Sequence, residues 1–251
     1  MSAATLPRTG VSAHWRELEE TLSDIGHRFR RAALASSLSA EDMVMTHAIA
    51  ALGAPIEVFV IDTGRLHAET LAVLAELQRR YALAVEVLRP QPDAVAAYVE
   101  RHGANAFYDR VDLRRRCCQI TKVEPLERAL AGRDAWLTGQ RRAQSSTRST
   151  LEVEERDDER GIIKFNPLAA WSDETVWSYV QQHDVPVNAL HARGYPSIGC
   201  EPCTRAIRPG EDPRAGRWWW EHSASKECGL HVVHAPVAST SPGRKSNERS
   251  A

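Results

Sequence analysis

Short apolar runs of strand length alternate with amphipathic segments of helix length along most of the chain, and this alternation constrains the fold more than any other feature. The clearest strand is Ile56–Ile61 (Ile-Glu-Val-Phe-Val-Ile), which is rich in β-branched residues. It is followed by Leu66–Tyr81, where apolar side chains recur at helical spacing. Strands that alternate with helices fold as a parallel sheet, because each helix returns the chain to the edge where the next strand starts. We therefore predict an α/β fold, a parallel twisted sheet flanked by helices.

The same pattern predicts the individual elements. We expect strands at Ala32–Leu38, Ile56–Ile61, Ala84–Leu88, Ala135–Gly139 and Ile162–Phe165. We expect helices at Trp15–Phe29, Met43–Leu52, Leu66–Tyr81 and Ala94–His102. A capping box at Thr121 and Glu124 predicts a further helix that ends at Leu130, and Ser172 is expected to cap the start of another. We expect the acidic run Glu152–Glu159 to be an exposed loop. Trp218–Trp220 could line a binding surface, but we expect them to pack the C-terminal segment against the sheet.

With 251 residues, 43% of them hydrophobic, the chain can bury a full core. We predict one domain over residues 1–234, followed by a Ser-, Pro- and charge-rich segment, residues 235–251, that we expect to be disordered. The formal net charge of −1 argues against nucleic-acid binding through a basic surface. No apolar run approaches the roughly 20 residues of a membrane span, so we expect no membrane contact. We see no secretory signal in the first residues.

Two stretches that follow predicted strands carry polar groups suited to a ligand. Ser37–Asp42 (Ser-Leu-Ser-Ala-Glu-Asp) joins a strand to a helix, and the N–H groups and dipole of a helix start favour an anion. Asp62–Gly64 (Asp-Thr-Gly) follows the next strand, at the edge where open α/β sheets bind ligands. Each stretch alone also fits an ordinary turn with a helix cap. The chain lacks the GxxxxGK[ST] pattern of a P-loop.

A basic loop follows the strand predicted at Ala135–Gly139. Arg141, Arg142 and Arg148 lie within it, and Gln144, Ser145 and Ser146 lie between the adjacent pair and Arg148. Guanidinium groups suit sulfate and phosphate oxygens because they donate paired hydrogen bonds. A solvated, charged loop is the alternative.

Four of the five cysteines form two close pairs, Cys117-Cys118 and Cys200-Glu-Pro-Cys203. This spacing does not resemble a secreted disulfide framework, so we expect reduced thiols and a cytoplasmic protein. A CxxC loop is a common half-site for zinc or an iron–sulfur cluster. Adjacent cysteines are awkward ligands for one small ion, whereas a cluster presents separate iron atoms. We therefore expect a [4Fe–4S] cluster ahead of zinc, and disulfides last.

The fifth cysteine, Cys228, has no such partner. It lies between Lys226 and His231 in the stretch Lys-Glu-Cys-Gly-Leu-His. An odd thiol in this setting is either incidental or a nucleophile.

Together these stretches resemble the assimilatory sulfonucleotide reductases, and within them the adenylyl-sulfate (APS) reductases that carry a cluster. The resemblance rests on SLSAED, IDTG, CCQITK, TGQRRAQS with a later TR, GCEPCTR and KECGLH, and it extends from about Ser36 to His231. It implies the adenine-nucleotide-hydrolase-like α/β fold and a mobile, catalytic C-terminal tail at residues 221–234. One departure is Ala143, where the family pattern has an acidic residue.

The resemblance also implies roles for individual residues. Cys228 matches the catalytic cysteine, with His231 and Lys122 beside the reacting group. Cys117, Cys118, Cys200 and Cys203 match the cluster ligands. The substrate-binding positions are Ser37, Ser39, Glu41, Asp42, Asp62, Thr63, Gly64, Arg141, Arg142, Arg148, Arg214 and Arg217.

In the reaction that this resemblance implies, the Cys228 thiolate attacks the sulfur of APS and AMP leaves, which forms an S-sulfocysteine. A thioredoxin thiolate then attacks the Cys228 sulfur and releases sulfite. Both electrons come from thiols, so the cluster would position and tune the sulfate site. This is a step of assimilatory sulfate reduction, which supplies cysteine biosynthesis.

Three alternatives remain at this point. The nearest is a reductase of the 3′-phosphorylated nucleotide (PAPS), although such relatives usually lack the four cluster cysteines. An ATP-dependent ligase or tRNA-thiolating enzyme on the same fold is more remote, because those resemble SGGxDS where this chain has SLSAED. The third is a zinc-binding interaction protein. The sequence leaves both a monomer and a homo-oligomer open.

Overall fold

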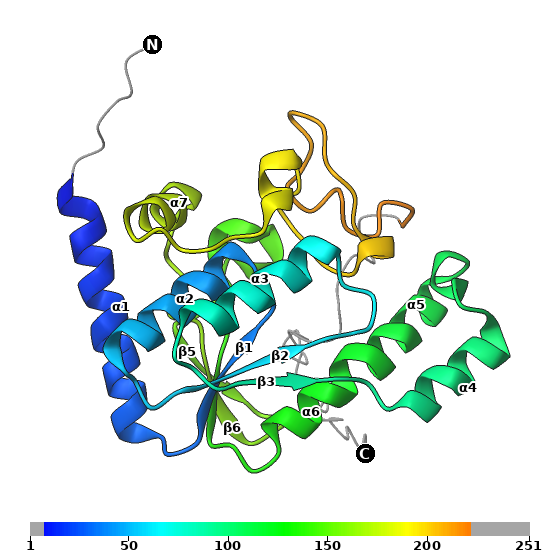
Figure 1. Cartoon of the computed structure of the whole chain (residues 1–251), viewed down its shortest axis with the longest axis horizontal. Helices are drawn as coiled ribbons and strands as arrows, with labels where there is room; N and C mark the ends of the chain where they lie inside the picture. Colours follow the sequence, from blue (N-terminus) through cyan, green and yellow to red (C-terminus); the bar gives the residue numbers. More distant parts are fainter. Residues whose placement is uncertain (1–7, 222–251) are drawn as a thin grey trace, which may run out of the picture.

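A computed structural model describes residues 8–221, which form a six-stranded sheet with helices on both faces (Figure 1). The strands lie in the order β3-β2-β1-β4-β6-β5. Neighbouring strands run parallel except β5, which pairs antiparallel with β6. The strands are β1 (Ala32–Ser36), β2 (Glu57–Ile61), β3 (Val85–Leu88), β4 (Ala135–Leu137), β5 (Glu154–Asp157) and β6 (Ile162–Phe165). This arrangement confirms the predicted α/β fold with a mostly parallel sheet.

Helices connect these strands. They are α1 (Arg8–Arg28), α2 (Ala40–Leu52), α3 (Ala68–Arg80), α4 (Pro92–His102), α5 (Val111–Cys118), α6 (Glu124–Leu130) and α7 (Asp173–Gln182). A π-helical turn, η2 (Gln119–Val123), joins α5 to α6. Short 3₁₀ turns are η1 (Ala106–Tyr108), η3 (Arg142–Gln144), η4 (Ser146–Arg148), η5 (Ala189–Arg193) and η6 (Glu201–Cys203). No helix within residues 8–221 has the length and apolar character needed to cross a membrane.

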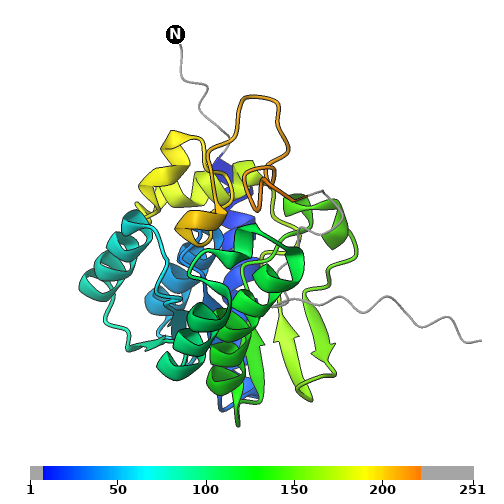
Figure 2. The same ribbon diagram turned by 90° about the vertical axis from the view of Figure 1, so that its right-hand side faces the viewer.

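The sheet separates two hydrophobic cores (Figure 2). Successive strand residues point to opposite faces. Leu34 and Val58 therefore pack into the larger core with α1, α2, α3 and α7, whereas Ala33 and Phe59 pack into a smaller core under α6. Burial of both faces explains why the central strands are apolar throughout rather than alternating.

The strand order changes direction at β1, which fixes where a ligand can bind. The chain adds β2 and β3 on one side of β1 and then crosses to place β4 on the other side. The loops that leave the carboxyl ends of β1 and β4 consequently diverge, which opens a crevice between them.

Local sequence explains where the two helices nearest this crevice begin. Ser39 caps α2 by accepting a hydrogen bond from the backbone N–H of Asp42, and Glu41 and Asp42 complement the helix dipole. Ser172 caps α7 in the same way by accepting from Thr175 at 3.1 Å. The cap predicted at Ser172 is thus confirmed.

Three local predictions were wrong. β1 ends at Ser36 instead of Leu38, because Leu38 has a left-handed backbone (φ 62°) that no strand residue adopts. Thr121 does not open a helix. The chain is already helical from Val111, and the Thr121 hydroxyl donates to the carbonyl of Cys117 at 2.9 Å. The expected acidic loop contains β5, whose exposed charges are compatible with an edge strand.

Trp218 packs as an apolar side chain, although not against the sheet. It is fully buried in a separate cluster with Phe107, Cys200 and Cys203, while Trp219 is exposed. Residues 222–234 of the predicted C-terminal tail and residues 235–251, for which disorder is predicted, lie outside the described residues.

A polar aromatic cluster holds α1, α2 and α7 together. His47 of α2 bonds the Tyr179 hydroxyl through Nδ1 at 2.7 Å, and the rings of Trp15 and His183 pack around the pair. Burial, together with the charges of the neighbouring His183 and Arg80, lowers the pKa of His47 to about 4. His47 is therefore neutral in the folded protein at pH values where an unfolded histidine is charged.

We expect this pKa to make the fold weaker in mild acid. Between about pH 6.5 and pH 4 His47 binds a proton in the unfolded state but stays neutral in the folded state. The free energy of unfolding therefore falls as the pH falls. For a half-buried ring the loss from pH 7 to pH 5 is about 1 kcal/mol. Urea unfolding at both pH values should show a smaller loss in His47→Gln than in the wild type. Replacing the exposed His27 by Gln is the control, and equal losses in wild type and His47→Gln would refute the assignment.

Candidate functional site

An open cavity of about 800 Å³ lies at the carboxyl ends of the parallel strands, at the crevice between β1 and β4. Its wall includes the start of α2 after β1, Thr63 after β2, and the segment that follows β4. Residues from η5 and from the chain between Pro196 and Trp218 complete the opposite side. The cavity therefore combines the loops that the sequence singled out with a segment distant in the chain.

Asp42 ties the two sheet loops together. Its buried carboxylate accepts from the backbone N–H and hydroxyl of Ser37 at 2.7 and 2.6 Å, and from the backbone N–H of Gly139 at 2.9 Å. Burial raises the pKa of Asp42, and the bonds from Ser37 partly offset that effect. Because these three donors occupy both oxygens, Asp42 shapes the cavity wall through the protein itself.

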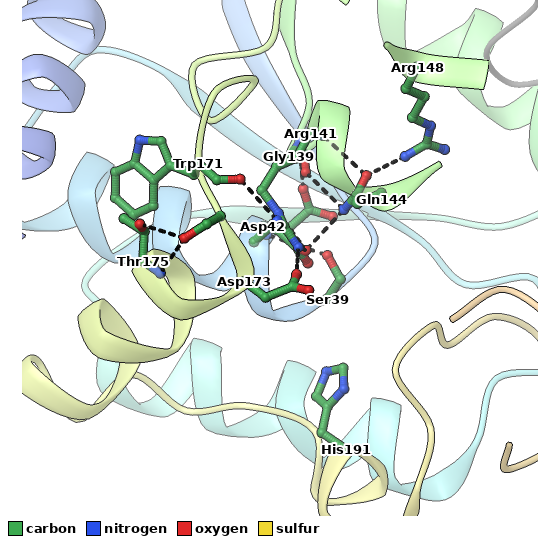
Figure 3. Close-up of polar contacts among 12 residues, drawn as sticks. Ser39, Asp42, Gly139, Arg141, Gln144, Arg148, Trp171, Asp173, Thr175 and His191 are labelled. Atoms are coloured by element: carbon green, nitrogen blue, oxygen red, sulfur yellow. Dashed lines mark hydrogen bonds and ion pairs between the residues drawn. The ribbon is translucent and has the colours of Figure 1, made fainter. Parts of the chain in front are cut away.

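Arg141 forms a second brace in the same wall (Figure 3). Its side chain is 4% exposed. It donates to Glu41 at 3.0 and 2.8 Å, to the Trp171 carbonyl at 3.0 Å, and to Asp173. Two carboxylates thus balance one guanidinium. The sequence predicted Arg141 as a substrate-binding residue; in the structure its donors join α2 to the start of α7.

The remaining predicted substrate positions divide into two groups. Asp62, Gly64 and Arg142 do not line the cavity: Asp62 pairs with Arg89 at 3.0 Å and accepts from the Gly64 N–H, and Arg142 donates to the Leu151 carbonyl at 2.7 Å. The predicted residues that do line it are Ser37, Ser39, Glu41, Asp42, Thr63, Lys122, Arg141, Arg148, Arg214 and Arg217.

The four paired cysteines come together beside this cavity. Cys117 and Cys118 end α5, Cys200 precedes η6 and Cys203 ends it, and all four line one small hollow. Cys118, Cys200 and Cys203 are buried and Cys117 is half-buried. The hollow shares Thr63, Lys122 and Cys200 with the large cavity, so the two are separated by a common wall.

Backbone contacts position the CxxC loop. Cys200 forms a β-bridge with Leu66, and the N–H of Glu201 donates to the carbonyl of Arg65 at 2.8 Å. On the other side, the N–H of Trp218 donates to the carbonyl of Cys203 at 3.0 Å. These contacts bring a loop without helical or strand periodicity to the end of β2.

The hollow is an unfavourable place for uncompensated thiolates. Burial, together with the charge of Cys200, raises the pKa of Cys203 to about 12. Burial also raises the pKa of Cys117. No three His, Cys, Asp or Glu side chains among residues 8–221 are arranged to hold a single metal ion. In the described part of the chain the fully buried indole N–H of Trp218 lacks a hydrogen-bond acceptor.

Two predicted catalytic residues, Cys228 and His231, lie outside the described residues. Sequence reasoning missed Gln144 and Asp173, which complete the Arg141 network, and His191 of η5, which lines the cavity opposite that network (Figure 3). Gln144 and Asp173 had no signal beyond their positions next to a basic loop and a helix cap. His191 has no ligand-like spacing to another histidine.

Comparison with known proteins identifies relatives over most of the chain. The phosphoadenosine phosphosulfate reductase domain matches residues 31–206. The adenosine 5′-phosphosulfate reductase of Burkholderia cepacia is 58% identical over 232 residues, which cover 92% of this chain and 93% of that protein. The adenosine 5′-phosphosulfate reductase of Allochromatium vinosum is 50% identical over 231 residues, which cover 92% of this chain and 88% of that protein.

Solved structures show the same fold at low identity. The phosphoadenylyl-sulfate reductase from Candida auris, solved as a phosphate complex, superimposes with a TM-score of 0.66 at 24% identity, covering 82% of this chain and 100% of that one. Yeast FAD synthetase superimposes with a TM-score of 0.54 at 14% identity, and the match covers 82% of this chain and 70% of that one.

The close contact between Asp42 and Gly139 predicts that one methyl group added at position 139 destabilises the fold. A Cβ on residue 139 would lie 2.4 Å from Asp42 Oδ1 and 2.8 Å from the Glu41 Cβ. Gly139→Ala should therefore lower the free energy of unfolding by about 1–3 kcal/mol, measured by urea titration. If the clash with Asp42 is responsible, Asp42→Ala and Gly139→Ala will be less than additive in a double-mutant cycle. Additive losses would exclude that cause.

Proposed function

Because the chain belongs to the phosphoadenosine phosphosulfate reductase family, we propose that it reduces adenylyl sulfate (APS) to sulfite and AMP with thioredoxin as the electron donor. The observation that carries the proposal is the common wall between the large cavity and the cysteine hollow. A nucleotide in the cavity would present its sulfate next to the cysteines. The relatives that are 50–58% identical are named for APS as substrate, which favours APS over PAPS.

The charges of the wall suggest how the substrate is held. The Arg141 charge is balanced by Glu41 and Asp173, so positive charge for the sulfate and phosphate must come from elsewhere in the wall. Arg148, Arg214, Arg217 and Lys122 line the cavity and supply it. The start of α2, with N–H groups directed along the helix axis, adds a further anion site.

We propose that Cys117, Cys118, Cys200 and Cys203 hold a [4Fe–4S] cluster. The hollow supports this in two ways: four thiols line it, and the raised pKa values of Cys117 and Cys203 mean that only a strongly cationic group would keep those two as thiolates. A cluster is larger than one ion, so it suits ligands that do not converge closely enough for a single metal. The unpaired N–H of Trp218, in the same packed cluster as Cys200 and Cys203, also fits a sulfur acceptor. When bound, the cluster would add a fixed charge distribution beside the sulfate.

The first chemical step is a transfer of the sulfo group. The Cys228 thiolate attacks the sulfur of APS, a sulfur–sulfur bond forms, and the sulfur–oxygen bond to AMP breaks. The sulfo oxygens carry negative charge, so an anionic nucleophile approaches them only where cations offset the repulsion. Lys122 lies in the common wall and is suited to that role, with His231 as a second cationic group suggested by the family resemblance.

The second step returns the enzyme to its thiol form. A thioredoxin thiolate attacks the Cys228 sulfur, sulfite leaves with the electron pair of the sulfur–sulfur bond, and a mixed disulfide forms. The second thioredoxin thiol then displaces Cys228. Two thiols thus supply both electrons, which is consistent with the thiol-reducing cytoplasm that we propose as the location.

We expect Cys228→Ser to abolish sulfite production, with a loss of at least about 10³-fold, because a serine hydroxyl is a far weaker nucleophile than a thiolate. Activity is measured with APS and thioredoxin, together with iron content and visible absorption. Cys228→Ser should keep the iron, whereas Cys203→Ser should lose it. Sulfite production by Cys228→Ser would remove this residue from the mechanism, and colourless wild-type protein with bound zinc would exclude the cluster.

We expect kcat/KM to be at least about tenfold higher for APS than for PAPS. The additional 3′-phosphate of PAPS needs cationic partners of its own, and Arg141 is already occupied by two carboxylates. Steady-state assays of sulfite release with each nucleotide measure the preference. Equal or higher values for PAPS would make the chain a PAPS reductase.

A further inference from the structure

A fully buried ion pair joins the cysteine helix to the end of the described chain. Arg114 of α5 donates to Glu221 through Nε at 2.9 Å and through Nη2 at 2.8 Å. The two side chains are 1% and 3% exposed. Paired, nearly parallel hydrogen bonds of this kind fix both the distance and the orientation of the carboxylate.

Both residues of the pair also contact the residues around the cysteine hollow. Arg114 lies one helical turn before Cys117, and its side chain lines the cysteine hollow. Its guanidinium packs over the Trp218 ring at 4.5 Å from the centroid. The N–H of Glu221 donates to the Trp218 carbonyl at 2.8 Å, while Trp218 itself is bonded to Cys203. Arg114 therefore contacts the hollow and holds Glu221 at the same time.

Stability alone is a poor explanation for this pair. Removing two charges from water costs about as much as their attraction returns, so apolar residues of similar size often serve equally well in a core. Unlike an apolar contact, the ion pair also fixes the relative orientation of its two side chains. It fixes the position and orientation of Glu221, the last residue that the structure describes.

The chain beyond Glu221 carries the proposed nucleophile, because Cys228 lies seven positions further on. Seven residues span at most about 25 Å when fully extended. A fixed Glu221 therefore limits the volume that the Cys228 thiol can visit and raises its effective concentration near the cysteine site. Releasing Glu221 would lengthen the tether and lower that concentration.

We propose that Arg114 and Glu221 are positioning residues, which anchor the C-terminal segment at the cysteine hollow so that Cys228 is held within reach of the bound sulfate. The positioning of Cys228 rests on the function proposed above, whereas the anchoring itself does not. The pair would also make the anchor depend on the cysteine site, since Arg114 and the cysteines share one helix.

The test compares Glu221→Gln and Arg114→Gln with the double variant Arg114→Met/Glu221→Met. The control is Glu154→Gln, which breaks another two-pronged Arg–Glu pair, the exposed one with Arg28. Single-turnover formation of the S-sulfo enzyme is measured together with KM for APS, iron content and thermal midpoint. Trypsin cleavage after Lys226 reports on the anchor without requiring any catalysis.

In both single variants we expect about tenfold slower S-sulfo formation with unchanged KM and iron content, and severalfold faster cleavage after Lys226. The double variant should recover the thermal midpoint, because it buries no unpaired charge, but should remain slow and readily cleaved. The control should match the wild type. A double variant with the wild-type rate and cleavage would overturn the proposal, because the pair would then matter only for stability.

The proposed function can fail separately. If the wild type forms no S-sulfocysteine at Cys228, the reductase mechanism is wrong, yet faster cleavage after Lys226 in the variants would still support the anchor. Unchanged cleavage in every variant would overturn the anchor whatever the activity.

Discussion

One buried carboxylate holds the site together. Asp42 accepts hydrogen bonds from the loop after β1 and from the loop after β4, which leave the sheet in different directions at the change of strand order. That link sets the separation of the two loops beyond the last paired residues of β1 and β4. Glu41, the preceding residue, makes the next link by receiving Arg141, which in turn reaches the start of α7. The cavity is therefore shaped by side chains from one helical turn.

The same arrangement changes the interpretation of the basic loop. Arginines near a strand end suggest anion binding, but a guanidinium that already faces two carboxylates contributes little net charge. Arg141 is a brace of this type, and Arg142 faces away toward Leu151. Cationic groups beside the cysteine hollow, such as Lys122, are better placed to bind the sulfate. Charge in this site is thus determined by which partners each arginine finds in the fold.

Much of the fold could be predicted because its signals are local. The β-branched run before Asp62 and the cap at Ser172 act over a few residues, and both are present as predicted. Contacts between distant residues carry no such signal. Nothing near Thr121 in the sequence shows that the chain is already helical from Val111, or that Gln144 will bind Glu41. The convergence of the two cysteine pairs followed from their spacing and the family resemblance, whereas the wall that they share with the cavity required the structure.

The acidic strand at the edge of the sheet has a consequence for self-association. β5 presents Glu154, Glu155, Arg156 and Asp157 along the open side of the sheet, beyond β6. A strand from another molecule that paired there would bring a second row of charges against these side chains and would strip them of water. Sheet extension across this edge is therefore opposed by the sequence of β5. Copies of this chain that associate would have to meet elsewhere, through β3 at the opposite edge of the sheet, through helices or through loops.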